Sequence, residues 1–227
     1  MFTDIFRFAA CLAVALVFSA PLQASENQQR ILMMGDSLLA SNRNGNRAVS
    51  NFLAEALPVS VTDKSVVGAK VIHHLPITGL VGFSIKQQYR KGDWDWVVLN
   101  GGGNDLLFGC GCHFCNRKID RLVSRSGQRG EIPNLIRKLR QTGARVIYVG
   151  YLRSPGLGSP IESCKDEGDE LESRINAFAE TDAGVHFLSL TEMVPHGDRS
   201  YHGLDMIHPS AKASREIALR VARLIAQ

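Results

Sequence analysis

A run of four apolar residues that stops at Gly35-Asp36-Ser37 constrains the fold of this chain more than any other stretch. Residues 31–34 are Ile, Leu, Met and Met, which is typical of a strand buried on both faces in a parallel sheet. Gly35 allows a tight turn because it lacks a Cβ atom. Ser37 would then lie just beyond the carboxyl end of a central strand, where open α/β sheets bind ligands. A turn capped by Asp36 and Ser37 has the same composition, so the motif alone is compatible with a purely structural turn.

The segments after this motif alternate between strand-like and helix-like patterns. Apolar or β-branched runs predict strands over residues 59–67, 94–99, 145–151 and 185–190. Apolar residues at helical spacing predict helices over residues 47–57, 80–89, 132–142 and 166–179, with a last helix after Pro209. Strands separated by helix-length segments predict an α/β fold in which helices cover both faces of a parallel sheet. The chain shows no internal repeat and no second domain.

The amino terminus has the features of a secretory signal peptide over residues 1–24. Arg7 supplies positive charge, residues 8–20 form an apolar centre, and Ala24 is a small residue before the expected cut. This apolar centre is shorter than the roughly 20 residues that span a bilayer, which favours cleavage over an uncleaved anchor. We therefore expect a secreted or periplasmic protein with a single domain over residues 25–227 and no stable membrane span after cleavage.

The charge pattern argues against a nucleic-acid partner. The formal net charge is only +4, and the Lys and Arg residues are scattered without interleaved aromatic residues. These residues fit solvated helix faces better than a nucleic-acid-binding surface.

The cysteines left after cleavage admit two interpretations. Cys110, Cys112, Cys115 and Cys164 are even in number, which in an oxidising compartment predicts two disulfides with three possible pairings. The compact Cys-Gly-Cys-His-Phe-Cys run, with His113 inside it, also resembles a metal-binding knuckle. Disulfides are favoured because an exported chain meets oxidants and because the second close Cys pair usual in structural zinc sites is missing.

Three further features follow or lie near predicted strand ends. Asp205 precedes His208 by three residues, so its carboxylate can accept the imidazole Nδ1–H and leave Nε2 free to take a proton from a serine. Asn104 follows a glycine-rich strand end, where its amide can donate to an oxyanion. Gly68 stands at a strand-loop junction, and its N–H can be a second donor. Taken singly, each is also compatible with a surface turn.

In combination and in this order, these blocks resemble the SGNH (GDSL-type) hydrolase family, whose naming residues would be Ser37, Gly68, Asn104 and His208. The resemblance covers essentially the whole mature chain and implies a flavodoxin-like, three-layer α/β/α fold. It implies that Ser37 is the nucleophile, that His208 is the general base and then acid, and that Asp205 orients His208. The implied oxyanion donors are the backbone N–H groups of Ser37 and Gly68 and the Asn104 side chain. No metal or cofactor is implied.

The resemblance therefore predicts a secreted serine ester hydrolase that cleaves carboxylic esters or thioesters of lipids or small acyl groups through an acyl-serine intermediate. A carbohydrate O-acetylesterase or an O-acyltransferase would use the same site. The alternative from another class is a metal-binding or redox module built on the cysteines and His113. The cysteine run departs from the plain family pattern, and we expect a disulfide there to stiffen the Asn104 loop or to tether it to the loop that bears Cys164.

Overall fold

The computed structural model describes residues 28–156 and 158–227, so the predicted signal peptide over residues 1–24 lies outside the described residues. Within these ranges, no helix combines the length and the apolar character that a bilayer crossing needs.

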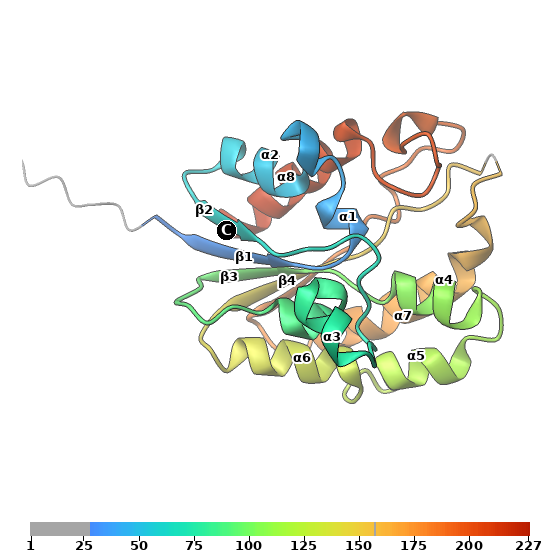
Figure 1. Cartoon of the computed structure of the whole chain (residues 1–227), viewed down its shortest axis with the longest axis horizontal. Coiled ribbons are helices and arrows are strands. Elements are labelled where there is room, and N and C mark those ends of the chain that lie inside the picture. The colour runs from blue at the N-terminus through green and yellow to red at the C-terminus, as the bar shows by residue number, and fades with distance from the viewer. Residues whose placement is uncertain (1–27, 157) are drawn as a thin grey trace, which may run out of the picture.

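A parallel sheet forms the centre of the molecule (Figure 1). In the described part of the chain its five strands are β1 (Arg30–Met34), β2 (Ser60–Asp63), β3 (Trp96–Leu99), β4 (Arg145–Val149) and β5 (Val185–Leu188), in the order β2-β1-β3-β4-β5. The strand β1 pairs with both β2 and β3, so it lies inside the sheet and its residues 31–34 are fully buried. This confirms the predicted α/β fold with a central parallel sheet.

Helices cover both faces of the sheet and make it a three-layer structure (Figure 1). One face carries α1 (Ser37–Ala40), α2 (Val49–Ala56) and α8 (Ala211–Ile225), and the other carries α3 (Pro76–Thr78), α4 (Gly103–Cys110), α5 (Asn116–Leu122), α6 (Glu131–Arg140) and α7 (Lys165–Ala179). Side chains of a strand point alternately to opposite faces. Ile31 and Met33 therefore pack in the α2–α8 core, and Leu32 and Met34 pack in the core beneath α4–α7.

Two predicted elements differ from the structure. The helix predicted over residues 80–89 is wrong as a continuous helix. Gly82 has a non-helical φ of 103° inside a π-helical turn, η2 (Gly79–Phe83), and the extended Ser84 separates this turn from a 3₁₀ turn, η3 (Ile85–Gln88). The strand predicted over residues 59–67 is shorter, because regular strand structure is confined to β2 (Ser60–Asp63). Beyond it, the Asp63 carboxylate accepts hydrogen bonds from the backbone N and the hydroxyl of Ser65, while Lys64 N and Val66 N still donate to Met33 O (2.8 Å) and Gly35 O (3.0 Å). Further 3₁₀ turns are η1 (Arg43–Gly45), η4 (Glu162–Cys164) and η5 (Arg199–Tyr201).

The cysteine segment forms the end of α4 and the start of α5. Cys110 pairs with Cys115, with Cα atoms 5.5 Å apart, and Cys112 pairs with Cys164 at the start of α7, with Cα atoms 4.7 Å apart. The predicted disulfides are therefore confirmed, and their pairing is resolved. Because all four thiols are consumed in these bonds, the cysteines do not form the alternative metal knuckle.

Candidate active site

The predicted site residues gather at the carboxyl edge of the sheet. Ser37 follows β1, Asn104 lies in the first turn of α4 after β3, and His208 lies in the loop before α8. The chain moves from β1 to β2 on one side and then back across to β3 on the other side. Loops that diverge in this way leave a crevice beyond the strand ends, which is where α/β sheets bind ligands.

The Ser37 turn is fixed by its neighbours. Ser37 is the first residue of α1, and the Asp36 side chain caps this helix by accepting a hydrogen bond of 3.0 Å from the Leu38 backbone N. A Cβ atom at Gly35 would lie 3.0 Å from the Leu39 side chain and 3.2 Å from the backbone oxygen of Asn100, so this tightly packed turn favours glycine. The serine is thereby held at the carboxyl end of β1 on a helix N-terminus.

Gln88 is a partner of this turn that sequence reasoning missed. Its side chain is buried and accepts a hydrogen bond of 2.7 Å from Gly35 N, while its Nε2 donates to Gly35 O (2.9 Å) and to Gly82 O (2.8 Å). The amide therefore satisfies both backbone groups of the residue before Asp36. Gln88 lies in the segment predicted as a regular helix, where no sequence signal separates it from a surface glutamine.

His208 and Asp205 are in direct contact. Asp205 Oδ2 lies 2.5 Å from His208 Nδ1, and Oδ1 accepts hydrogen bonds of 3.0 Å from the backbone N of both Ile207 and His208. Partial burial opposes ionisation, but these hydrogen bonds prevail and lower the pKa of Asp205 to about 2. An ionised Asp205 keeps the proton on Nδ1 and leaves Nε2 as the basic nitrogen.

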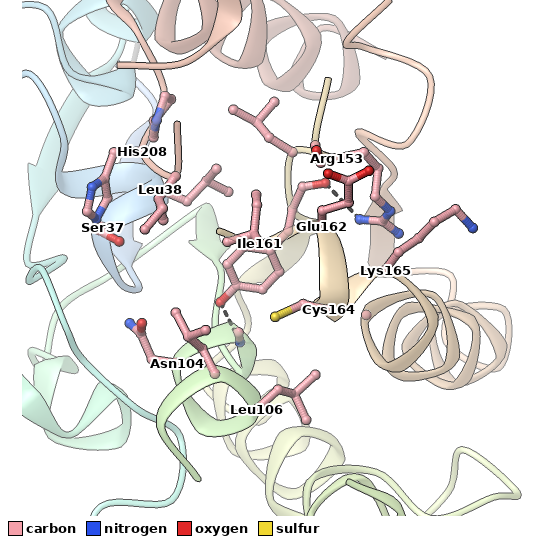
Figure 2. Close-up of a pocket in the computed structure, with 18 of the residues that line it drawn as sticks. Ser37, Leu38, Asn104, Leu106, Arg153, Ile161, Glu162, Cys164, Lys165 and His208 are labelled. Carbon is pink, nitrogen blue, oxygen red and sulfur yellow. Dashed lines mark hydrogen bonds between the residues drawn. The ribbon is translucent and has the colours of Figure 1, made fainter. Parts of the chain in front are cut away.

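The loop that bears His208 is also tied to the serine side of the site. Asn42 lies just past α1, and its side chain donates hydrogen bonds to Pro209 O (3.0 Å) and to Ser214 Oγ (3.0 Å). Asn42 and Pro209 are 167 residues apart in the sequence. Figure 2 shows His208 beside Ser37 at one side of the pocket, and both residues line the same cavity. The Asn42 contacts therefore tie the segment after α1 to the start of α8, with Ser37 and His208 on the same cavity.

Asn104 and Gly68 meet through the loop after β2. Asn104 Nδ2 donates a hydrogen bond of 3.0 Å to Ala69 O, and a side-chain amide carries a second N–H that this contact leaves free. The adjacent Asp105 accepts hydrogen bonds from the backbone N of Val71 (2.9 Å) and Ile72 (2.8 Å). Gly68 has a φ of 80°, which fits its predicted place at a turn, but it does not line the cavity that holds Ser37, Asn104 and His208.

A buried acid and a tyrosine link the two halves of the site. Asp36 is 1% exposed and accepts a hydrogen bond from the Tyr151 hydroxyl, which in turn accepts one of 2.9 Å from Gly103 N. Burial raises the pKa of Asp36 to about 6, against the lowering effects of the hydrogen bonds from Tyr151 and Leu38. Tyr151 ends a predicted strand, which places it at the correct edge of the sheet, but nothing in the sequence indicates this contact.

The cavity beside these residues is about 360 Å³ in volume, within the range of small-molecule sites. Its apolar lining comes from α1, α4, α7 and the loops near residues 152 and 161, and consists of Leu38, Leu106, Leu107, Leu152, Ile161 and Leu171. Cys164 lies in the same wall, so the Cys112–Cys164 disulfide braces it. Figure 2 shows Arg153, Glu162 and Lys165 on the side of the pocket opposite Ser37.

The two cations on that opposite side, Arg153 and Lys165, already have carboxylate partners. Arg153 contacts Glu172 at 2.8 Å and Asp169 at 2.7 Å, and Lys165 contacts Asp169 at 2.9 Å. Their charges are therefore largely compensated within the protein. The arrangement offers a ligand an apolar interior with a serine, a histidine and an amide at one side.

Comparison with known proteins identifies the class. The model of the GDSL-like lipase/acylhydrolase family matches residues 33–215, so the chain belongs to this family of ester-bond hydrolases. A search of curated proteins found no significant match.

Solved structures share the fold at low sequence identity. A protein provisionally assigned as an SGNH hydrolase from Slackia heliotrinireducens has 22% identity and a TM-score of 0.57, over 88% of this chain and 100% of that chain. TesA has 19% identity and a TM-score of 0.59, over 87% and 98% of the two chains. A family two carbohydrate esterase from Clostridium thermocellum has 20% identity and a TM-score of 0.57, over 87% of this chain and 63% of that chain. The chain therefore has the SGNH-hydrolase fold.

Proposed function

We propose that this protein is an exported serine hydrolase that cleaves carboxylic esters or thioesters of lipid or small acyl groups through an acyl-Ser37 intermediate. The observation that carries the proposal is the convergence of Ser37, Asn104 and an Asp205-oriented His208 on one apolar cavity. The family supplies the reaction class, and this geometry supports the proposed role of each residue.

In the proposed mechanism, His208 Nε2 accepts the Ser37 hydroxyl proton as Oγ attacks the acyl carbonyl. Asp205 stabilises the imidazolium that forms, which its low pKa favours. The tetrahedral oxyanion accepts hydrogen bonds from the free Nδ2–H of Asn104 and from the backbone N–H of Ser37, whereas Gly68, the third donor expected from the sequence, does not line the cavity. His208 then protonates the leaving alcohol or thiol, and a water molecule activated by His208 hydrolyses the acyl-enzyme.

The cavity supports an acyl group as the part of the substrate that is buried. Its lining surface is mostly apolar and includes six leucine and isoleucine side chains, and each methylene buried against such a surface contributes about 0.8 kcal/mol. A sugar would place hydroxyl groups against these walls without hydrogen-bond partners, which costs about 1–3 kcal/mol per group. These terms favour an aliphatic acyl chain over a carbohydrate as the occupant.

A chain-length series of p-nitrophenyl esters and acyl thioesters tests the function, with Ser37→Ala as the control. We expect kcat/KM to rise with acyl length until the cavity is full and then to fall, and we expect Ser37→Ala to be folded and inactive. A fluorophosphonate probe should label Ser37 of the native enzyme, as located by peptide mass spectrometry. Activity retained by Ser37→Ala, or labelling at another residue, would exclude the mechanism.

Export is the second part of the proposal. It is supported by the signal-like residues 1–24 together with the Cys110–Cys115 and Cys112–Cys164 disulfides, since such bonds persist in oxidising compartments. Amino-terminal sequencing of protein recovered from the periplasm or medium should find a chain that begins near Ser25. An intact Met1 on membrane-bound protein would indicate an uncleaved anchor instead.

A further inference from the structure

The surface around α3 exposes large apolar side chains. Leu75, Ile77, Leu80 and Val81 are 65%, 79%, 71% and 68% exposed, respectively. Val67, Phe83 and Phe108 are also exposed. We call these seven residues the α3 patch. Single exposed apolar side chains are ordinary, but a contiguous group of this kind marks an interaction surface.

The α3 patch adjoins the oxyanion side of the site. A Cβ atom at Gly68 would lie 3.6 Å from the Phe83 ring, and Lys70 N donates a hydrogen bond of 2.9 Å to Phe83 O. Phe108 is on α4, one helical turn beyond Asn104, and Lys70 Nζ lies 5.5 Å from the centre of its ring. In Figure 1, α3 lies on the same side of the sheet as α4, opposite α2 and α8. A ligand surface that covered the patch would therefore reach the edge of the active site.

The chain segment that carries most of the patch is strongly cationic. Residues 64–92 contain Lys64, Lys70, Lys86, Arg90 and Lys91 and no acidic residue, whereas the whole chain has a formal net charge of only +4. Glu131 from α6 pairs with Lys86 at 2.5 Å. Lys70, which contacts Phe108, has no carboxylate partner among the ion pairs of the described residues. Of these cations, Lys70 contacts a member of the patch, so positive charge lies beside apolar groups at Phe108.

We propose that the α3 patch docks the enzyme on the surface of an anionic lipid bilayer. Leu75, Ile77, Leu80 and Val81 would enter the boundary between head groups and acyl chains, and Lys70 would contact anionic head groups. Binding at such a boundary grows with the apolar area buried and with attraction to anionic lipids, and both contributions are present here. Docking of this kind is separate from ester cleavage, so it does not depend on the proposed function.

Vesicle sedimentation of the Ser37→Ala protein tests the docking without hydrolysis. We expect binding to vesicles of phosphatidylcholine with one quarter phosphatidylglycerol, weak binding to phosphatidylcholine alone, and a marked decrease in 0.5 M NaCl. Ile77→Asp with Leu80→Asp should weaken partitioning by at least about tenfold, because charge replaces inserted apolar groups. Lys70→Gln should weaken it by about fivefold on the anionic vesicles only.

The matched control is Ala54→Asp with Ala56→Asp, which adds the same charge at exposed positions of α2 on the opposite face. This control should retain most of the vesicle binding, because the altered residues lie away from the α3 patch. All variants should hydrolyse a water-soluble ester as the unaltered enzyme does when Ser37 is present. Equal vesicle binding by the patch and control variants, or no binding by the parent protein, would overturn the proposal. So would a dimer, seen by analytical ultracentrifugation, that Ile77→Asp with Leu80→Asp dissociates.

Discussion

At the scale of single residues, Asp36 makes stabilising hydrogen bonds, but its burial disfavours the charged form of its carboxyl group. Its carboxyl group caps α1 and accepts the Tyr151 hydroxyl, but its burial raises the pKa to about 6. The folded state thus binds the Asp36 proton more tightly than the unfolded chain, in which the pKa of this carboxyl group is near 3.8. The stabilisation associated with this proton is complete below pH 3.8 and is lost as the pH rises through 6.

We predict that Asp36→Asn removes this pH dependence. The difference between about 6 and 3.8 corresponds to roughly 3 kcal/mol, so the free energy of unfolding of the native protein should fall by about that amount, relative to the variant, between pH 4 and pH 7. The asparagine oxygen can still cap α1 through Leu38 N. Urea unfolding at several pH values measures the effect, and parallel curves for the two proteins would contradict it.

Asn104 is the second residue whose change gives a defined expectation. Asn104→Ala should lower kcat/KM by about 10²–10³-fold, because one oxyanion donor contributes about 2.7–4 kcal/mol to transition-state stabilisation. KM should change little, since the donor acts mainly on the developing oxyanion. Steady-state kinetics with a soluble ester measures this effect, with thermal unfolding as the check that the loss of the Ala69 contact leaves the fold intact. A loss that appears only in KM would assign Asn104 to substrate binding.

At the scale of elements, the turn between β1 and α1 is held by a side chain from η3. Gln88→Ala would leave the buried N–H of Gly35 without its partner, at a cost of about 1–3 kcal/mol, while Gly35 O would keep only its hydrogen bond from Val66 N (3.0 Å). We predict a lower melting temperature and a fall in kcat with KM nearly unchanged, because the serine would lose its position. Gln87→Ala, which alters an exposed residue of the same element, is the matched control. Identical kinetics for the two variants would show that Gln88 does not position the serine.

The two disulfides close loops of very different length. Cys112–Cys164 joins residues 52 apart and ties α4 to α7, whereas Cys110–Cys115 joins residues 5 apart. In the chain-entropy model, removal of these bonds costs about 4 and about 2 kcal/mol, respectively.

We therefore predict that Cys112→Ser with Cys164→Ser destabilises the protein more than Cys110→Ser with Cys115→Ser. The first pair should also broaden the preferred range of acyl lengths, because Cys164 lines the cavity and its wall would lose its brace. Urea unfolding and the chain-length series measure these effects. Unchanged selectivity in the first variant would limit the role of that bond to stability.

At the scale of the whole molecule, the sheet could be predicted because its strands are buried runs with distinct boundaries. The apolar run over residues 31–34 predicts a buried strand, and in the structure these residues form a buried strand. The elements on the α3 side were less predictable, since Gly82 breaks a helical pattern and the cysteine segment hides the start of α5. In those places local backbone strain and disulfides, rather than hydrophobic periodicity, determine the path of the chain.

The site was predictable where reactive residues follow strand ends in a recognisable order. Ser37, Asn104 and His208 do line one cavity, although their roles in catalysis remain predictions. The supporting contacts from Gln88 and Tyr151 were not predictable, because each depends on a side chain that reaches a distant backbone or carboxyl group. Such contacts appear only once the segments are folded against one another.

The contact of Asn42 with Pro209 has a consequence for biosynthesis. Ser37 emerges from the ribosome long before His208, and the Asn42 contacts that tie the His208 loop to the segment after α1 form only once the start of α8 has been made. In the proposed mechanism, a nascent or truncated chain therefore carries the serine without the group that activates it. Under that mechanism, the producing cell would be protected from ester cleavage by unfinished copies of the protein.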